Sequence, residues 1–494
     1  MNILSIDLGT TNIKVALTKV DGNGIRIVKS MNINVPAEKP EFRAYEHNPY
    51  IIKKLIFNSI RHFSKHENID ALVFTVYLFG LIGLNAELKP VTNIITWLDE
   101  RPMVAAKHLK PYERELYVRT GCPVLHIYGL PKILWLRKYR KAIFNRIKYF
   151  LDAKSFLMLM FTGDLISDYS TVSGTYQLLN IHELKWDSYA LSIAELDENM
   201  LPEIAEGLYN TEVIRNVQEK LGLPEKTPVV IGLYDSASMI YGLTLGKSGV
   251  GVINIGTSAM LRTVVDKPII DDPKMMRFQT YYLMEKRWLS GGGINNAGVV
   301  LEYLREQLFP KESKDIFYKE LLRNIEIDQG IRNKMLFIPL LYVERLPLIQ
   351  SNIGGCIIGL SEKRNRIDII RAAIEGIIFL LKIIDDGIRD NGIVCDEVVI
   401  GGKISQYSFV QKALANILGR KVIYCGVPDA SHIGNALIAL RSLRACGKKE
   451  IENYYESLMS KCESIFPTRN LQKHYNELYE YFKEILRKVY NVKI

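Results

Sequence analysis

Cysteine and histidine are scarce and scattered in this 494-residue chain, which has six cysteines and eight histidines. No cysteines form a CxxC pair and no histidines form an HxH or HxxxH array, so neither a zinc site nor a disulfide framework is predicted. We expect reduced thiols, as in a cytoplasmic protein. The cysteines are Cys122, Cys356, Cys395, Cys425, Cys446 and Cys462.

Long apolar runs are also missing. No stretch approaches the roughly 20 apolar residues that a membrane span needs. The N-terminus reads at once as a strand, without the basic and apolar regions of a signal peptide. We therefore expect a cytoplasmic protein without membrane association.

Positive charge is present but not concentrated. The net charge is +10, and the densest basic stretch is 132–148. This stretch is more typical of a solvated helical face than of a nucleic-acid groove, so no nucleic-acid partner is expected. A hydrophobic content of 48% and a charged content of 24% are those of a globular protein, long enough for at least two domains.

One short pattern occurs twice. An apolar strand, a Gly-Thr-Thr/Ser turn and a second apolar strand occupy residues 6–15 and again 253–260. Such a turn exposes backbone N–H groups and two hydroxyls at a strand tip, where they can hold phosphate oxygens. Two copies predict a duplicated fold whose two domains hold one polyphosphate, such as ATP, between them.

The elements around the two turns repeat as well, as three strands and a helix. The first copy is expected at 2–8, 13–20, 25–34 and 51–63, followed by a strand at 71–76, and the second at 250–255, 260–265 and 278–283 with a helix from residue 295. Small residues at 242–249 predict the boundary, which gives domains 1–245 and 246–494. An amphipathic helix is predicted over 471–489, packing on its own domain.

Asp7 ends the first strand, directly before the first turn. A carboxylate there can hold a magnesium ion beside the β- and γ-phosphates. The structural alternative is a cap of the tight turn. The second copy has Asn254 at this position, which avoids placing two negative groups against ATP.

Asp235 follows the predicted strand 229–231 and precedes a helix of small residues. It could accept the proton of a substrate hydroxyl as that oxygen attacks the γ-phosphorus. The alternative is an N-cap of the helix that follows. Spacing alone does not separate the two.

Three further segments give weaker signals. Residues 97–101 combine a tryptophan, two carboxylates and a guanidinium that could contact a sugar, but a charged helix start fits them better when taken alone. The glycines at 291–293 could let backbone approach a ligand or form an ordinary turn. Gly401-Gly402 could admit a flat nucleoside, although a plain turn explains the pair better.

With these residues assembled, the chain resembles the FGGY carbohydrate kinases, within the actin/Hsp70/sugar-kinase superfamily, over nearly its whole length. Besides the two turns, the matching segments are 97–101 (the family's W-x-D-x-R), 121–123, 132–135, 167–175, 232–235, 344–347 and 401–402. The resemblance implies an α/β fold of two ribonuclease H-like domains with a cleft between them. It also implies ATP and Mg²⁺ in that cleft and Asp235 as the general base.

Within the family, residues 255–262 and 288–298 look most like gluconate kinases (gluconokinases), as do residues 168–170. The expected reaction is therefore phosphorylation of D-gluconate to 6-phosphogluconate, with a xylulokinase-like or other polyol kinase as the alternative. The arginine and glutamate that glycerol kinases carry after the 71–76 strand are missing. A homodimer is left open, since the sequence does not fix the oligomeric state.

The resemblance gives two sets of expected contacts. The nucleotide, its phosphates or the metal are expected at Asp7, Gly9, Thr10, Thr11, Lys14, Gly256, Thr257, Gly293, Asn296, Gly401, Gly402 and Lys403. The substrate is expected at Tyr77, Phe79, Trp97, Asp99, Arg101 and Asp235.

The chain departs from the family pattern at several positions. Tyr77 and Phe79 replace side chains that could bond polyol hydroxyls, and Lys403 stands where a third glycine is common. Asp429 and Asn435 replace the usual glutamate and alanine before the last conserved helix. These departures motivate a second hypothesis, a non-catalytic regulator that binds nucleotide or sugar.

The retention of both the metal-holding and the proton-accepting aspartate argues against such a regulator. A third class, an actin- or Hsp70-like assembly or chaperone protein, would share the turns. It is not expected to carry the segments 97–101 and 167–175.

Overall fold

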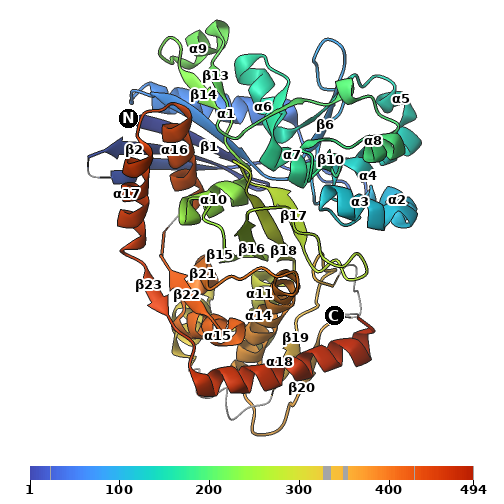
Figure 1. Ribbon diagram of the computed structural model, residues 1–494, viewed down its shortest axis with the longest axis vertical. Coiled ribbons are helices and arrows are strands. Elements are labelled where there is room, and N and C mark those ends of the chain that lie inside the picture. The colour runs from blue at the N-terminus through green and yellow to red at the C-terminus, as the bar shows by residue number, and fades with distance from the viewer. Residues whose placement is uncertain (23, 326–334, 349–353, 428, 493–494) are drawn as a thin grey trace.

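The computed structural model describes residues 1–22, 24–325, 335–348, 354–427 and 429–492. The chain forms two halves, each built around a mixed β-sheet (Figure 1). The N-terminal sheet lies in the upper part of the view and the C-terminal sheet in the lower part, with helix α10 (Asp235–Thr244) between them. In the described part of the chain, no helix is both long enough and apolar enough to cross a membrane.

The N-terminal sheet has the strand order β13-β14-β5-β1-β2-β3. Its strands are β1 (Asn2–Leu8), β2 (Asn12–Asp21), β3 (Gly24–Asn34), β5 (Ala71–Val76), β13 (Asn210–Glu212) and β14 (Pro228–Val230). β1 pairs antiparallel with β2 and parallel with β5, and β5 pairs parallel with β14. The central strand β5 is buried at every residue, because helices cover both faces of the sheet.

The C-terminal sheet has the order β17-β18-β16-β15-β21-β22-β23. Its strands are β15 (Val250–Ile255), β16 (Ala259–Val265), β17 (Gln279–Tyr282), β18 (Trp288–Ile294), β21 (Glu397–Gly401), β22 (Lys421–Tyr424) and β23 (Glu463–Ile465). β15 pairs with β16 and β21 as β1 pairs with β2 and β5. The predicted duplication is therefore present in the sheet topology.

The third strand of the second copy is not where the sequence placed it. The segment predicted at 278–283 is β17, an edge strand, whereas β16 pairs with β18 over Ala259–Val265. Residues 291–293 lie inside β18 and not in a turn. The reason is steric: these glycines leave room on a crowded strand, since a Cβ on Gly292 would lie 2.9 Å from the Leu346 side chain.

A smaller lobe is formed mainly by residues between β5 and β14, together with a short strand that precedes β5. Its sheet has the order β4-β7-β6-β8, from β4 (Glu46–His47), β6 (Leu81–Leu84), β7 (Ile94–Ile95) and β8 (Tyr149–Asp152). The helices that precede or follow these strands are α1 (Pro49–Ser64), α2 (Met103–His108), α3 (Glu113–Thr120), α4 (Gly129–Tyr139), α6 (Ala153–Thr162), α7 (Tyr169–Thr175), α8 (Ser188–Ala194) and α9 (Arg215–Leu221). Figure 1 shows this lobe in cyan and green at the upper right.

The main helices of the C-terminal half are α11 (Gly298–Leu308), α14 (Arg366–Asp390), α15 (Ser408–Leu418), α16 (Ala430–Ser442), α17 (Lys448–Met459) and α18 (Arg469–Tyr490). The amphipathic helix predicted at 471–489 is confirmed as α18. It buries Leu471, Leu478 and Phe482 in the core cluster that also holds residues of α14 and α15.

Helices α10 and α16 cross in close contact between the two sheets. A Cβ on Gly434 of α16 would lie 1.8 Å from the carbonyl oxygen of Ser238 in α10, and one on Gly242 of α10 would lie 2.7 Å from that of Ala430. Only glycines allow the two backbones to approach this closely. Gly242, which the sequence placed at the domain boundary, is thus an interior helix residue.

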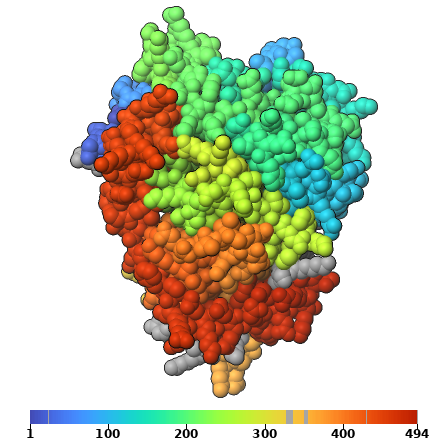
Figure 2. All heavy atoms as spheres, in the orientation of Figure 1, coloured from blue at the N-terminus to red at the C-terminus, as the bar shows by residue number. Residues whose placement is uncertain are grey.

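Helix α16 belongs to the C-terminal half of the chain but packs on the N-terminal sheet. The Asn435 amide donates to Ser5 Oγ of β1 at 2.6 Å and accepts from Thr75 Oγ1 of β5 at 2.8 Å. His432 Nδ1 lies 2.8 Å from the same Ser5 hydroxyl. Figure 2 shows the orange-red surface of this part of the chain rising along the left edge onto the upper half.

One disulfide corrects the expectation of reduced thiols. Cys425 and Cys462 are bonded, with their Cα atoms 4.1 Å apart. Tyr424 at the end of β22 pairs with Glu463 at the start of β23, so the two cysteines are the next directly opposed residues. Their separation of 37 residues hid this neighbourhood from the sequence.

Substituting Gly434→Ala should destabilise the protein strongly, because the new Cβ would overlap the Ser238 carbonyl and only a backbone shift could relieve the overlap. We expect the free energy of unfolding to fall by about 3 kcal/mol, measured by denaturant titration. The control is Gly22→Ala, whose Cβ would meet nothing within 4 Å. Equal stability of the two variants would contradict the close crossing.

Thiol counting on unfolded protein that was prepared without reductant should find four free cysteines, namely Cys122, Cys356, Cys395 and Cys446. After reduction the count should rise to six. The Cys425→Ser/Cys462→Ser double variant should give four under both conditions and should unfold about 2–4 kcal/mol more easily than the oxidised protein. Six thiols before reduction would rule the disulfide out.

Candidate active site

Three parallel segments end at one edge of the N-terminal sheet. Asp7 lies opposite Thr75 across β1 and β5, and Val76 bridges to Tyr234 in the segment after β14. Asp235 follows Tyr234 directly. Because parallel strands in register end at the same edge, the folded chain brings Asp7 and Asp235 together although 228 positions separate them in the sequence.

Asp7 is 8% exposed, and its Oδ1 atom is buried without a hydrogen-bond partner among the described residues. Its Oδ2 atom has one long contact, 3.5 Å from Ser431 Oγ. Burial above all, and then the charge of Asp235, raise the pKa of Asp7 to about 7, while Lys14 lowers it. A bound cation would remove this penalty.

The Asp7 carboxylate is compatible with a Mg²⁺ site of the kind found beside phosphates. No group of three or more histidine, cysteine, aspartate or glutamate residues that could cage a metal is found within the described ranges. Mg²⁺ in phosphate-binding sites is held by one or two carboxylates together with phosphate oxygens and water. The buried, unpartnered carboxylate of Asp7 fits that kind of site.

Asp235 is the first residue of α10 and is half-buried. Its Oδ1 accepts hydrogen bonds from the Ser236 N–H at 2.5 Å and the Ser236 hydroxyl at 3.1 Å. The helix cap position is Tyr234, without a side-chain cap, so the N-cap alternative is not realised. Burial raises the pKa of Asp235, against the Ser236 bonds and the charges of Arg262 and Lys14.

A buried lysine lies behind this edge of the sheet. Lys154 Nζ donates to the carbonyl oxygens of Phe74 at 2.8 Å, Ile231 at 2.5 Å and Leu233 at 3.1 Å. It thereby ties the end of β5 to the loop that carries Asp235. The sequence interpretation gave Lys154 no role, because a lysine at a helix start gives no sign of its three acceptors.

Each Gly-Thr turn is closed by a bond from its glycine N–H, but the second turn is one residue shorter than the first. The Gly9 N–H donates to the Asn12 carbonyl at 3.0 Å, and the Gly256 N–H donates to the Ser258 carbonyl at 2.9 Å. Thr11 and Thr257 are exposed, so their hydroxyls can reach a ligand.

The other nucleotide candidates surround the second turn. Gly402, at φ +89°, packs so tightly that a Cβ would lie 2.4 Å from the Ile255 carbonyl oxygen, and Gly401 pairs with Asn254. Lys403 is exposed. Asn296, in contrast, is buried and donates to the Glu344 carboxylate at 2.8 Å.

Lys14 pairs with a residue from the other half of the chain. Its Nζ lies 2.8 Å from Asp429 Oδ1, at the start of α16. Both side chains are substantially exposed, so the pair itself contributes little stability. Its position is informative, because it holds a lysine beside Asp7, which neighbours Lys14 across β1 and β2.

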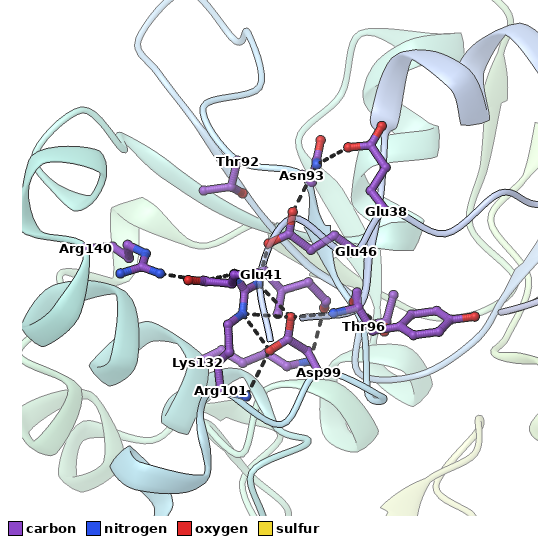
Figure 3. Close-up of polar contacts among 12 residues, drawn as sticks. Glu38, Glu41, Glu46, Thr92, Asn93, Thr96, Asp99, Arg101, Lys132 and Arg140 are labelled. Atoms are coloured by element: carbon purple, nitrogen blue, oxygen red, sulfur yellow. Dashed lines mark hydrogen bonds and ion pairs between the residues drawn. The ribbon is translucent and has the colours of Figure 1, made fainter. Parts of the chain in front are cut away.

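Asp99 and Arg101 form hydrogen bonds with each other and with residues in β4 and the loop before it (Figure 3). Arg101 donates through Nε and Nη2 to Asp99, through Nη1 to Glu41 at 2.6 Å, and through Nη2 to Glu46. The Asp99 carboxylate is fully buried and also accepts from the Tyr45 N–H at 3.0 Å. These contacts favour a structural role, and the predicted substrate contacts of the two residues stay a prediction.

The Trp97 side chain contacts the first Gly-Thr turn, which is far from it in the sequence. The indole N–H donates to Thr10 Oγ1 at 3.0 Å, and the ring lies 5.4 Å from the Arg345 guanidinium. The predicted alternative, a charged helix start at 97–101, is not present, since α2 begins at Met103. Trp97 therefore joins a turn of the N-terminal half to an arginine of the C-terminal half.

Tyr77 and Phe79 are both buried. The Tyr77 hydroxyl lies 2.8 Å from His47 Nδ1, and Phe79 adopts a left-handed backbone conformation with φ +72°. The Phe79 carbonyl accepts from Lys132 Nζ, which also donates to Ile95 at 3.1 Å. Lys132 is fully buried, so the prediction of a solvated basic face is wrong at this residue.

Comparison with known proteins gives a consistent result. Residues 2–242 match the N-terminal domain, and residues 251–443 the C-terminal domain, of the FGGY family of carbohydrate kinases. The chain is 27% identical to the gluconokinase of Bacillus subtilis (strain 168), over 99% of this chain and 96% of that protein.

Two crystal structures from Lactobacillus acidophilus, a gluconate kinase and a ligand-bound xylulose kinase, each superpose with a TM-score of 0.90 and 25% identity, over 99% of this chain and 98% of theirs. The predicted two-domain α/β fold is confirmed.

Ionisation of Asp7 should destabilise the metal-free protein as pH rises. Its pKa is raised on folding, so the folded state keeps a proton that the unfolded chain releases from about pH 4 upward. The free energy of unfolding should therefore fall by roughly 4 kcal/mol between pH 4 and pH 8. Asp7→Asn should lack this loss, and the exposed Asp266→Asn should retain it. Parallel pH profiles of Asp7→Asn and the wild type would contradict the raised pKa.

Proposed function

Because the chain belongs to the FGGY family of carbohydrate kinases and is a phosphotransferase, we propose that it transfers the γ-phosphate of ATP to D-gluconate, giving 6-phosphogluconate. The observation that carries this proposal is the convergence of Asp7 and Asp235 at one sheet edge, beside the Gly-Thr turn. Similarity to gluconokinases of two Bacillus species supports the choice of acceptor.

In this proposal Asp235 accepts the proton of the attacking hydroxyl. Burial raises its pKa toward the working range of a general base, while its bonds to Ser236 keep the carboxylate oriented. Mg²⁺ held by Asp7 would offset the negative charge of the β- and γ-phosphates. Thr10, Thr11, Gly256 and Thr257 hold the phosphates, again as a proposal.

We further propose that residues 1–245 supply the acceptor and metal side and residues 246–494 the nucleotide side, with Gly401 and Gly402 next to the nucleoside. The position of Gly402, packed on the end of β15 beside the second turn, supports this division. Helix α16 is the exception, because it carries Ser431 from the C-terminal half to Asp7.

D-Xylulose is the second candidate acceptor. The xylulose kinase structure superposes as well as the gluconate kinase structure does, with the same TM-score of 0.90. The xylulose kinase of Staphylococcus xylosus is 22% identical over 98% of this chain. The fold therefore does not separate the two acceptors, and the side chains at the site must.

A screen of ATP consumption over D-gluconate, D-xylulose, glycerol and related polyols should give the highest kcat/KM with D-gluconate. Asp235→Asn should lower kcat about 10²–10⁴-fold, since an amide cannot take up the proton, while the KM for ATP stays unchanged. Asp266→Asn, in an exposed ion pair with Arg287, is the matched control and should retain full activity.

Turnover that survives undiminished in Asp235→Asn would contradict its role as base. A preference for D-xylulose would establish the second candidate. Calorimetry with ATP and Mg²⁺ separates the remaining hypothesis, because nucleotide binding without turnover on any acceptor would identify a non-catalytic regulator.

A further inference from the structure

Two buried or half-buried guanidinium groups form no salt bridge with a described carboxylate, although the charge of Asp235 acts on Arg262 and that of Glu344 acts on Arg345. Arg262 is 6% exposed, and Arg345 is half-buried. Neither arginine forms a salt bridge with any described residue, and the Nε of Arg345 is buried without a hydrogen-bond partner. An arginine keeps its charge in proteins, and burying a charge without a counter-charge is costly. The pair therefore has guanidinium N–H groups available to a bound anion.

The two guanidinium groups lie on one face of the C-terminal sheet. Arg262 of β16 pairs with Gly291 of β18, and the Arg345 guanidinium lies 3.1 Å from the point where a Cβ on Gly293 would be. Residues two apart on a strand share a face, so Gly291 and Gly293 open the same side. Gly292 points to the other side, toward Leu346 and Ile384. Gly293 thus makes room for the Arg345 guanidinium, whereas a Cβ on Gly291 would meet the backbone of Leu261 and Arg262.

The nearest carboxylate is already occupied. Glu344 directly precedes Arg345, but its two oxygens accept the backbone N–H groups of Asn295 at 2.5 Å and Asn296 at 3.2 Å. Its side chain also accepts the amide of Asn296 at 2.8 Å. Glu344 therefore fixes the turn before α11, and it acts on Arg345 through its charge and by accepting the Arg345 backbone N–H at 2.9 Å, without a bond from the guanidinium.

Hydroxyl groups surround the pair and connect it to the proposed base. Arg262 lies 4.3 Å from the Tyr281 ring and donates to Gln279 Oε1 at 3.1 Å. The Tyr281 ring is 6.3 Å from the ring of Tyr234, the residue before Asp235, whose hydroxyl is buried without a partner within the described ranges. Polar groups with unused bonding capacity are suited to a polyhydroxylated ligand.

We propose that Arg262 and Arg345 together bind the carboxylate of a sugar-acid substrate and so select acids over neutral sugars. This inference rests on the proposed function, since it assumes that Asp235 activates the acceptor hydroxyl. A planar guanidinium donates two parallel bonds to a carboxylate, which gives both affinity and orientation. In D-gluconate the carboxylate and the C6 hydroxyl are at opposite ends of the carbon chain. Binding of the carboxylate therefore orients the C6 hydroxyl toward Asp235.

The phosphates of ATP are the other possible anion, but the strand geometry disfavours them at Arg262. The second Gly-Thr turn ends at Ser258, and Arg262 lies four residues further along β16, roughly 13 Å away at the usual rise of a strand. At Arg262 the carboxylate of the acceptor is therefore the anion that fits.

The test compares D-gluconate with D-glucitol, which has an alcohol in place of the carboxylate. In Arg345→Gln and in Arg262→Gln we expect the KM for D-gluconate to rise about 100-fold, while kcat/KM for D-glucitol and KM for ATP stay within a few-fold. Arg345→Lys should recover part of the loss. The control is Arg305→Gln, on α11 and paired with Glu302. Direct calorimetry with D-gluconate, and a melting curve for each variant, separate lost binding from lost folding.

The outcomes distinguish this inference from the proposed function. Equal losses on D-gluconate and D-glucitol, or a raised KM for ATP with every acceptor, would overturn the carboxylate site and leave the kinase assignment intact. Turnover of another sugar acid in place of D-gluconate, with the same dependence on both arginines, would replace D-gluconate and support the site. A wild type that phosphorylates only neutral sugars would overturn both.

Discussion

The close crossing of α10 and α16 is the contact on which the site depends. Gly434 of α16 lies against Ser238 of α10. Ser238 comes three residues after Asp235, and Gly434 comes three residues after Ser431, which contacts Asp7. Each helix therefore places a site residue about one turn from the same fixed contact. A side chain at the crossing would separate the helices and move Asp235 relative to Asp7. Gly242 of α10 and Gly434 of α16 come from different halves of the chain, so the crossing also joins those halves.

This arrangement makes the two halves interdependent. Helix α16 is encoded near the C-terminal end but bonds through Asn435 to Ser5 and Thr75 of the N-terminal sheet. The Lys14–Asp429 ion pair and the Trp97–Arg345 contact link the same halves at the site. Any movement of one half relative to the other must act on these links. The last two links lie beside the first Gly-Thr turn, so relative movement of the halves would act directly on the proposed phosphate site.

Charge is left unbalanced at the site in two places of opposite sign. Around Asp7 the excess charge is negative. Asp235 and Asp429 raise the pKa of Asp7, and Lys14 is the basic residue that lowers it. On the β16–β18 face the excess is positive, from Arg262 and Arg345. The proposed metal and nucleotide would balance the first excess, and the proposed acidic acceptor would balance the second. The two regions meet at Asp235, on which the charge of Arg262 acts.

Local patterns in the sequence determined the two Gly-Thr turns, the strands around them, the amphipathic α18, and Asp7 and Asp235 as site candidates. Turn chemistry and hydrophobic periodicity depend on neighbouring residues, so one sequence suffices to read them. Only the tertiary structure decided which partners each side chain finds. In the folded chain Asp99, Arg101 and Asn296 form internal hydrogen bonds, and Lys132 is buried. The glycines at 291–293 lie inside a strand, and Cys425 is bonded to Cys462. Folding also left Arg262 and Arg345 without a salt bridge to any described residue. Most of these outcomes depend on residues that are tens to hundreds of positions apart in the sequence. A local pattern does not show which of these residues lie close together in space.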